Sequence, residues 1–323
     1  MSLTIWCNAE FSESATKRLV EGAKPHRLLR ATQASASVLT RAEKDPAFAE
    51  ADIAFGQPAV QDCVDSPRIR WIELSSAGYT RYDREDFKDV LRKRGAPLTN
   101  ASQVFAESCA QHVLAMMLGL ARQLPQALRD QLTDRSWHWS EHRYNSRSPV
   151  GQTVLLLGFG AIGRRLVELL APFRMTVLAL RRQTRSESAV RIIAAENISS
   201  ALAEADHVVN ILPENNETVG FVNARRLACF KTGARFYNVG RGTTVDQGAL
   251  VEALYSRRLD AAYLDVTDPE PLPVDHPLWT TPNCFITPHT AGGRHDQDEA
   301  LVDHFLANLK AFQAGTALTD RIV

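Results

Sequence analysis

Short apolar runs alternate with amphipathic stretches along most of this sequence, a pattern typical of parallel strands joined by helices. Within the first hundred residues the runs that predict strands are Leu3–Cys7, Arg27–Ala31, Ala51–Phe55, Ile69–Leu74 and Ala96–Thr99. Helical segments lie between them, such as Glu13–Gly22 and Asp83–Arg94, with Gly22 and Gly95 as C-terminal stops. These units predict a small flavodoxin-like sheet.

A second series of strands is expected further along the chain. A long helix, roughly Val104–Leu128, should come first, followed by a polar and aromatic loop over Thr133–Ser148. The next predicted strands are Thr153–Leu157, Arg174–Leu180, His207–Leu212, Ala234–Val239, Ala261–Val266 and Cys284–Thr287. Six strands separated by helices are what two mononucleotide-binding halves require. A last helix, about Asp298–Gln313, should pack back on the first sheet.

The predicted fold class is therefore α/β with two domains. A Rossmann-type doubly wound parallel sheet over residues 101–289 is inserted into a flavodoxin-like substrate domain, which residues 1–100 form and residues 290–323 complete. The length of 323 residues agrees with this division, because a single core seldom grows beyond about 250 to 300 residues.

Composition narrows the class of protein. The 37 basic residues cancel the 37 acidic ones, so the chain has no global field for a nucleic-acid backbone, and no nucleic-acid partner is expected. Strongly apolar stretches such as Val113–Ala121 are shorter than the roughly 18 residues of a membrane helix. The N-terminus does not resemble a signal peptide. Five cysteines without a C-x-x-C pair fit reduced thiols, so we expect a cytoplasmic protein.

A glycine-rich turn, Gly158-Phe159-Gly160-Ala161-Ile162-Gly163, follows an apolar strand directly and opens an apolar helix. In this setting the string predicts a dinucleotide site: the glycines permit a tight turn, close approach of a pyrophosphate and close helix–strand contact. The first N–H groups of the helix would face the phosphates. The alternative is an ordinary strand–helix turn that happens to be rich in glycine.

Basic residues follow the next predicted strand, where an NAD-specific site usually has an acid for the ribose 2′-hydroxyl. Arg181 and Arg182 stand there instead, and guanidinium groups suit a 2′-phosphate through charge-assisted hydrogen bonds. The sequence therefore predicts a preference for NADP(H), with NAD(H) still possible. A solvated basic loop is the alternative interpretation.

Three chemically active side chains each follow a later strand: Arg241, Glu270 and His289. Because open α/β sheets bind ligands at the carboxyl ends of their strands, we expect the three to converge. Arginine can grip a carboxylate, histidine can exchange a proton with a developing alkoxide, and a carboxylate can orient that histidine. Considered alone, each of these three residues is equally well explained as a surface, loop or structural residue. The histidines show no metal-ligand spacing, so no metal is expected.

The strings V-G-Q-T-V-L-L-L-G-F-G-A-I-G, N-V-G-R-G, L-D-V-T-D-P-E-P-L-P and T-P-H-T-A-G together resemble the D-isomer-specific 2-hydroxyacid dehydrogenase family. The resemblance covers most of the chain, and it implies that Arg241, Glu270 and His289 are the catalytic set. It also implies that the backbone N–H groups of Ala77 and Gly78 bind the substrate carboxylate. The resemblance extends the cofactor-binding set to Leu212, Pro213, Thr218, Val239, Asp265 and Gly292.

Within that family, the arginines at 181 and 182 resemble those of NADPH-using glyoxylate and hydroxypyruvate reductases, and Glu270 argues against formate dehydrogenase. The family often dimerises through the long helix and the loop after it, so Trp137 and Trp139 would lie near a partner's active site or pack within one subunit. Thr80 stands where the family often carries an aspartate, and the stretch before Val104 lacks the usual Pro-Gly. Both departures leave the substrate open.

The leading hypothesis from the sequence is an NADP(H)-dependent reductase of a small 2-keto acid, with a D-2-hydroxy acid as product. One alternative is a non-enzymatic dinucleotide sensor on the same fold. Another is a dehydrogenase of an unusual donor such as phosphite.

Overall fold

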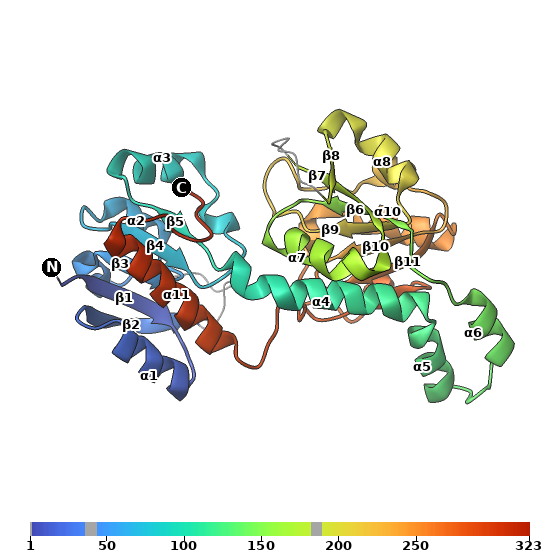
Figure 1. The fold of residues 1–323 in the computed structure, drawn as a ribbon, viewed down its shortest axis with the longest axis horizontal. Helices are drawn as coiled ribbons and strands as arrows, with labels where there is room; N and C mark the ends of the chain where they lie inside the picture. Colours follow the sequence, from blue (N-terminus) through green and yellow to red (C-terminus); the bar gives the residue numbers. More distant parts are fainter. Residues whose placement is uncertain (1, 36–43, 182–188) are drawn as a thin grey trace. The chain divides into compact units, whose positions relative to one another are not determined.

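The computed structural model describes residues 2–35, 44–181 and 189–323 (Figure 1). The chain divides into two compact units, Met1–Phe105 with Arg294–Val323 and Ala106–Gly293. Each unit is built around one sheet whose paired strands are all parallel. The predicted α/β fold class is confirmed.

The first unit contains the sheet predicted for the N-terminal hundred residues. Its strands, in the spatial order β2-β1-β3-β4-β5, are β1 (Thr4–Ala9), β2 (Arg27–Ser35), β3 (Ile53–Gly56), β4 (Trp71–Leu74) and β5 (Leu98–Thr99). This is the flavodoxin-like order, in which a crossover helix joins neighbouring parallel strands. The helices of this unit are α1 (Glu13–Gly22), α2 (Val60–Asp65), α3 (Glu85–Arg94) and α11 (Gln297–Ala314).

Helix α11 packs on this sheet, as the sequence predicted. The ring of Phe305 stacks on Phe55 at 4.3 Å and on Trp71 at 5.3 Å between centroids. Helix α1 ends at Gly22 as predicted, but the residue that caps it is Ala23, in a right-handed conformation. A Cβ on Gly22 would collide with Leu306 of α11, so the glycine also permits close packing. Gly95, at φ +63°, is the left-handed cap of α3 that was expected.

The second unit has seven strands in the order β12-β11-β10-β9-β6-β7-β8. They are β6 (Thr153–Leu157), β7 (Thr176–Leu180), β8 (Arg191–Ile193), β9 (His207–Asn210), β10 (Ala234–Asn238), β11 (Leu259–Leu264) and β12 (Cys284–Ile286). The strand order reverses between β6 and β9, which is the switch point of a doubly wound sheet. The six predicted strands are present. The seventh, β8, was missed because it has only three residues and its apolar pair, Ile192 and Ile193, follows an arginine. Helices α7 (Ala161–Leu170), α8 (Ile198–Glu204), α9 (Ala224–Leu227) and α10 (Gln247–Tyr255) connect the strands.

The predicted helix Val104–Leu128 is two helices, α4 (Ser102–Ala121) and α5 (Leu124–Leu132). The break lies at Gln123, which has φ +59° and is followed by Pro125 in the first turn of α5. The predicted loop over 133–148 was also partly wrong, because it contains helix α6 (Trp139–Asn145). We call residues 124–145 the arm; its exposed large apolar side chains are Leu124, Leu128, Leu132, Trp137, Trp139 and Tyr144.

Helix α4 is the one described helix that is long and apolar enough to cross a membrane, with 20 residues and a mean hydropathy of 1.4. The apolar run Val113–Ala121 is only the second half of this helix, so the expectation that no stretch is long enough was wrong for α4. Val113, Met117 and Leu120 of this helix are buried in the core of the second unit. A core helix passes the same test of length and composition, so the feature is weak support for a membrane span.

A buried charged cluster ties α11 and the C-terminal segment to the first sheet. Nδ1 of His304 lies 2.7 Å from a carboxylate oxygen of Glu73 on β4, and its Nε2 lies 3.3 Å from the carboxylate of Asp320. The second oxygen of Glu73 accepts hydrogen bonds from Asn308 and Thr99. Burial alone would lower the pKa of His304, but the two carboxylates raise it to about 9. The imidazolium is therefore the form that stabilises this unit at neutral pH.

We expect His304→Gln to lower the free energy of unfolding in a pH-dependent way. The folded-state pKa of about 9 lies above the ordinary 6.5, so the stabilisation is full below pH 6.5 and is lost as the pH rises through 9. Urea unfolding should show a deficit on the order of 2 to 3 kcal/mol at pH 6 that shrinks above pH 9.

The matched control is His295→Gln, because the side chain of His295 is 97% exposed. This variant should unfold like the unsubstituted protein at every pH. A His304→Gln deficit that stays constant from pH 6 to pH 10 would show that the ring contributes packing and not charge.

Candidate active site

Arg241 lies in the loop between β10 and helix α10, in the second unit. Its backbone is extended, with φ −143° and ψ 145°, and its side chain is half-buried. The guanidinium Nη1 donates a hydrogen bond to the carbonyl of Gly240 at 2.7 Å. The carboxyl end of β10 thus presents a guanidinium, the group that binds carboxylates in a fork geometry.

Glu270 and His289 follow β11 and β12, and the structure brings them into contact. The His289 Nδ1–H donates to a carboxylate oxygen of Glu270 at 2.8 Å, and the other oxygen accepts from the Thr267 N–H at 3.0 Å. His289 has φ +54°, a left-handed backbone that residues other than glycine seldom adopt. With Nδ1 engaged, Nε2 is the ring atom left to exchange a proton with a ligand.

The contact between His289 and Glu270 favours the protonated form of the His289 ring. The hydrogen bond to Glu270 raises the pKa of His289 above its ordinary value, while burial and the charge of Arg241 oppose this rise. Burial alone would raise the pKa of Glu270, but the hydrogen bonds from His289 and Thr267 lower it. Arg241 acts electrostatically on both groups, so the three predicted side chains share one site within the second unit.

The loops that carry these side chains touch through their backbones. A Cβ on Gly242 would collide with the carbonyl of Thr267, in the loop that leads to Glu270. Thr267 in turn donates its N–H to Glu270. Only glycine permits this contact, so Gly242 allows Arg241 and Glu270 to be neighbours. Gly242 is the last residue of the string N-V-G-R-G, but the pattern of the sequence does not reveal this steric role.

Asp265, predicted to bind the cofactor, anchors the loop that carries His289. Its buried carboxylate accepts hydrogen bonds from the N–H groups of Thr290 and Ala291 at 2.8 and 2.9 Å, and from the hydroxyl of Thr287 at 2.7 Å. Its carbonyl accepts from the His289 N–H at 2.8 Å. The position of His289 therefore depends on Asp265, a dependence that the sequence did not reveal.

The glycine turn has the shape that a pyrophosphate requires. Gly158 has φ +99°, and Gly163 is buried in α7, where a Cβ would meet Phe159 at 3.1 Å. A Cβ on Gly160 would point into open space at the N-terminus of α7, so its absence leaves room for a close ligand. The ten-residue helix directs its first N–H groups and its positive dipole end toward that space. These residues fit a dinucleotide.

The other predicted cofactor residues lie in strand-end loops of the same unit. Leu212 is buried after β9, and the hydroxyl of Thr218 donates to the carbonyl of Pro213 at 2.6 Å, which shapes that loop. Val239 and Gly292 follow β10 and β12. Arg181 follows β7, and Arg182 lies outside the described residues.

Ala77 and Gly78 lie in the first unit, in the loop after β4. Three consecutive carbonyls of this loop face the protein: Ser76 accepts from the Ala101 N–H, Ala77 from the side chain of Asn100, and Gly78 from the hydroxyl of Ser76. Because the C=O and N–H of a trans peptide point in opposite directions, the Ala77 and Gly78 N–H groups face away from these partners. That orientation suits the carboxylate binding expected of them.

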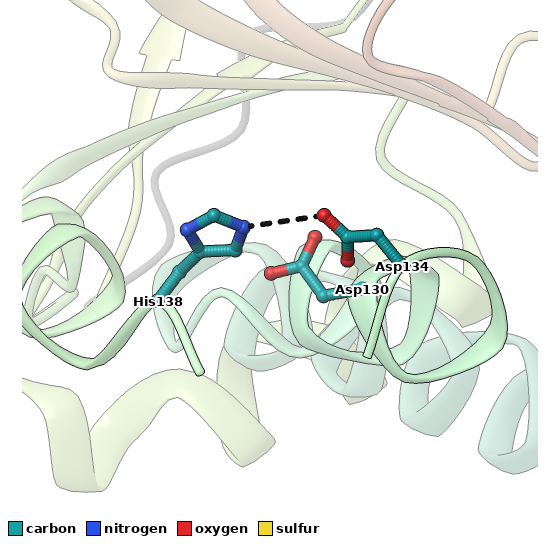
Figure 2. A group of neighbouring side chains, drawn as sticks. All are labelled: Asp130, Asp134 and His138. Atoms are coloured by element: carbon teal, nitrogen blue, oxygen red, sulfur yellow. Dashed lines mark ion pairs between the residues drawn. The ribbon is translucent and has the colours of Figure 1, made fainter. Parts of the chain in front are cut away.

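A group of side chains with metal-ligating atoms lies on the arm, contrary to the spacing argument from the sequence. Ligand atoms of Asp130, Asp134 and His138 lie within 4.8 Å of one another (Figure 2). His138 is 3.7 Å from Asp134, and Asp130 pairs with His142 at 2.7 Å. The i, i+4 spacing of these residues was overlooked. Asp134 and His138 are exposed, so surface ion pairs account for the group.

Comparisons with known proteins indicate the family to which this chain belongs. Residues 114–291 match the family model of the D-isomer specific 2-hydroxyacid dehydrogenase NAD binding domain. The glyoxylate/hydroxypyruvate reductase B of Pectobacterium carotovorum is 32% identical over 271 residues, which cover 81% of this chain and 83% of the relative.

Two solved structures share the fold over the whole chain. A D-isomer specific 2-hydroxyacid dehydrogenase from Xanthobacter autotrophicus Py2, in complex with NADPH and MES, is 27% identical with a TM-score of 0.83 and covers 100% of this chain and 98% of its own. An NADPH-dependent glyoxylate/hydroxypyruvate reductase from Sinorhizobium meliloti, in complex with NADP and malonate, is 25% identical with a TM-score of 0.73 and covers 100% and 97%.

The match to an NAD binding domain and the curated reductase relatives show that this protein is a nicotinamide-dependent oxidoreductase. The chain belongs to the D-isomer-specific 2-hydroxyacid dehydrogenase family, which confirms the resemblance noted in the sequence.

Replacing Glu270 by Gln should lower the pKa of His289, because the variant removes the carboxylate that stabilises the imidazolium. Titration of the ring by NMR measures the pKa directly. Glu252→Gln, on an exposed face of α10, is the control and should leave the pKa unchanged. An unchanged pKa in Glu270→Gln would mean that the 2.8 Å contact does not persist in solution.

Proposed function

We propose that this protein reduces a small 2-keto acid to the D-2-hydroxy acid with NADPH, with glyoxylate or hydroxypyruvate as favoured substrates. The observation that carries the proposal is the hydrogen-bonded pair His289–Glu270 in the electrostatic field of Arg241, at the strand ends of a Rossmann-type unit. Proton donation and carboxylate binding are the two tasks that a protein must perform in this reaction.

Each residue of the site has a separate role in the proposal. Arg241 binds the substrate carboxylate through its guanidinium and polarises the adjacent carbonyl. His289 donates the proton from Nε2 to the carbonyl oxygen as that oxygen becomes an alkoxide, and takes the proton back in the reverse direction. Glu270 orients the ring through Nδ1 and favours the charged form. The N–H groups of Ala77 and Gly78 are further ligands of the carboxylate. The bound nicotinamide supplies the hydride.

Two observations support the preference for NADPH: the residues that follow β7 and the cofactors bound in related structures. No acidic residue stands at the end of β7, where Arg181 and Arg182 follow in the chain. A guanidinium attracts a 2′-phosphate, and the structures of the Xanthobacter and Sinorhizobium relatives contain NADPH and NADP. The names of the Pectobacterium and Sinorhizobium reductases support glyoxylate or hydroxypyruvate as substrate.

We also infer a cytoplasmic homodimer that associates through the arm. Leu128, Leu132 and Trp137 are more than half exposed there, which is unusual for several large apolar side chains on one segment. A second copy of the arm would cover them. Trp137 and Trp139 are then candidates for a place near the partner's active site.

Purified protein should oxidise NADPH in the presence of glyoxylate or hydroxypyruvate, faster than with pyruvate or a bulky aromatic keto acid. His289→Asn should bind NADPH with nearly unchanged affinity, and its turnover should fall by a factor on the order of a hundred. Absorbance of NADPH reports turnover, and fluorescence titration reports binding. Tight binding of NADPH without turnover on any acid of the panel would favour the sensor or an unusual donor instead.

Changing Arg181 and Arg182 to Ala should weaken NADPH selectively, because only NADPH presents a 2′-phosphate to the guanidinium groups. We expect the KM for NADPH to rise on the order of tenfold or more while that for NADH changes little. Arg191→Ala, at the start of the neighbouring strand β8, is a control that removes an exposed arginine. An equal rise in the KM for NADPH and for NADH would contradict the assignment of Arg181 and Arg182 to the 2′-phosphate.

A further inference from the structure

A chain of buried polar side chains lies between two loops of the active-site edge. Asn210 ends β9 and Asn238 ends β10, where the two residues are paired in register. Thr244 follows Arg241 in the chain, and all three side chains are at most 1% exposed. Burying amides and a hydroxyl in a core costs free energy unless each is bonded, so these partners are informative.

The hydrogen bonds form a continuous path. Nδ2 of Asn210 donates to Oδ1 of Asn238 at 2.9 Å and to Oγ1 of Thr244 at 2.7 Å. Oδ1 of Asn210 accepts from the Leu212 N–H at 3.3 Å, and Oδ1 of Asn238 accepts from the Gly240 N–H at 3.1 Å. Because a backbone N–H can only donate, these contacts determine which way each amide faces.

Two branches of the path end on one atom, the carbonyl oxygen of Arg241. Nδ2 of Asn238 donates to it at 3.2 Å, and the hydroxyl of Thr244 donates to it at 2.6 Å. The carbonyl of Arg241 is therefore held by one side chain at the end of β10 and one in the following turn, and Asn210 on β9 donates to both of these side chains. The other end of the path is the Leu212 N–H, where the predicted cofactor loop begins.

We propose that Asn210, Asn238 and Thr244 are positioning residues that hold Arg241 where its guanidinium receives the substrate carboxylate, an inference that rests on the function proposed above. A fork of two hydrogen bonds is sensitive to small displacements, and a buried polar group without a partner is destabilising, so this network resists rearrangement.

Two substitutions at Thr244 separate positioning from packing. Thr244→Val keeps the shape but removes the hydroxyl, whereas Thr244→Ser keeps the hydroxyl and removes a methyl group. We expect the Val variant to raise the KM for the keto acid and lower kcat, with a fall in kcat/KM on the order of tenfold. The Ser variant should stay within about twofold of the unsubstituted protein. NADPH affinity, measured by fluorescence, should be unchanged in both. A lower kcat/KM in Thr244→Ser than in Thr244→Val would overturn the proposal, and so would a parallel loss of NADPH binding.

A double-mutant cycle with Arg241→Ala tests whether the effect passes through Arg241. In that background, Thr244→Val should cause little further loss, because the group it positions is gone. An equal loss in both backgrounds would overturn the positioning role and leave the proposed function intact. Unchanged kinetics in Arg241→Ala alone would instead contradict the proposed role of Arg241, and with it this inference.

Asn238→Asp serves as the second variant where Thr244→Val does not fold. Its carboxylate still accepts from the Gly240 N–H but faces the Arg241 carbonyl without a donor, so the same rise in KM is expected. The control is Asn283→Asp, which removes the hydrogen bond to the Asp260 carbonyl at the other end of the sheet. The control should keep normal kinetics; an equal kinetic loss in the control would overturn the proposal.

Discussion

The loops after β9, β10 and β11 lie so close together that two of their positions exclude any side chain. A Cβ on Gly240 would come within 2.7 Å of the carbonyl of Leu212, and one on Gly242 would collide with the backbone at Thr267. Atoms cannot approach at such distances, so this backbone contact is a steric constraint on the whole edge of the sheet. Arg241 lies between the two glycines. The Arg241 backbone, the Glu270 loop and the loop that begins at Leu212 keep their spacing because the main chains touch directly.

Three histidines differ in protonation because their surroundings differ. Burial lowers the pKa of His207 to about 4, and its ring, bonded to Tyr237 and Gln152, is a neutral part of the core. His304 is held as a cation between two carboxylates. His289 has one carboxylate partner, which raises the pKa of the ring, and an exposed edge through which it can exchange a proton with a ligand. Only the last of these environments suits proton transfer to a ligand.

Most strands of both sheets could be predicted because strands of a parallel sheet are covered on both faces and read as continuous apolar runs. The errors have local physical causes. Helix α4 ends at Ala121, and the left-handed backbone of Gln123 separates it from α5, although the apolar periodicity continues into α5. Helix α6 is short and polar and has no buried side chain, so nothing in its pattern separates it from a loop.

The sequence by itself determined the order of strands and helices, the glycine turn and the identity of the three chemical groups, because these depend on residue type and near-neighbour spacing. Tertiary structure alone decided the 2.8 Å contact between Glu270 and His289, the anchoring of the His289 loop by Asp265 and the path from Asn210 to Arg241. These partners are separated by 19 to 34 positions in the chain. The hydrophobic periodicity of a sequence does not show which residues meet across such separations in the chain. They meet because the pairing of parallel strands brings the strand ends to one edge of the sheet.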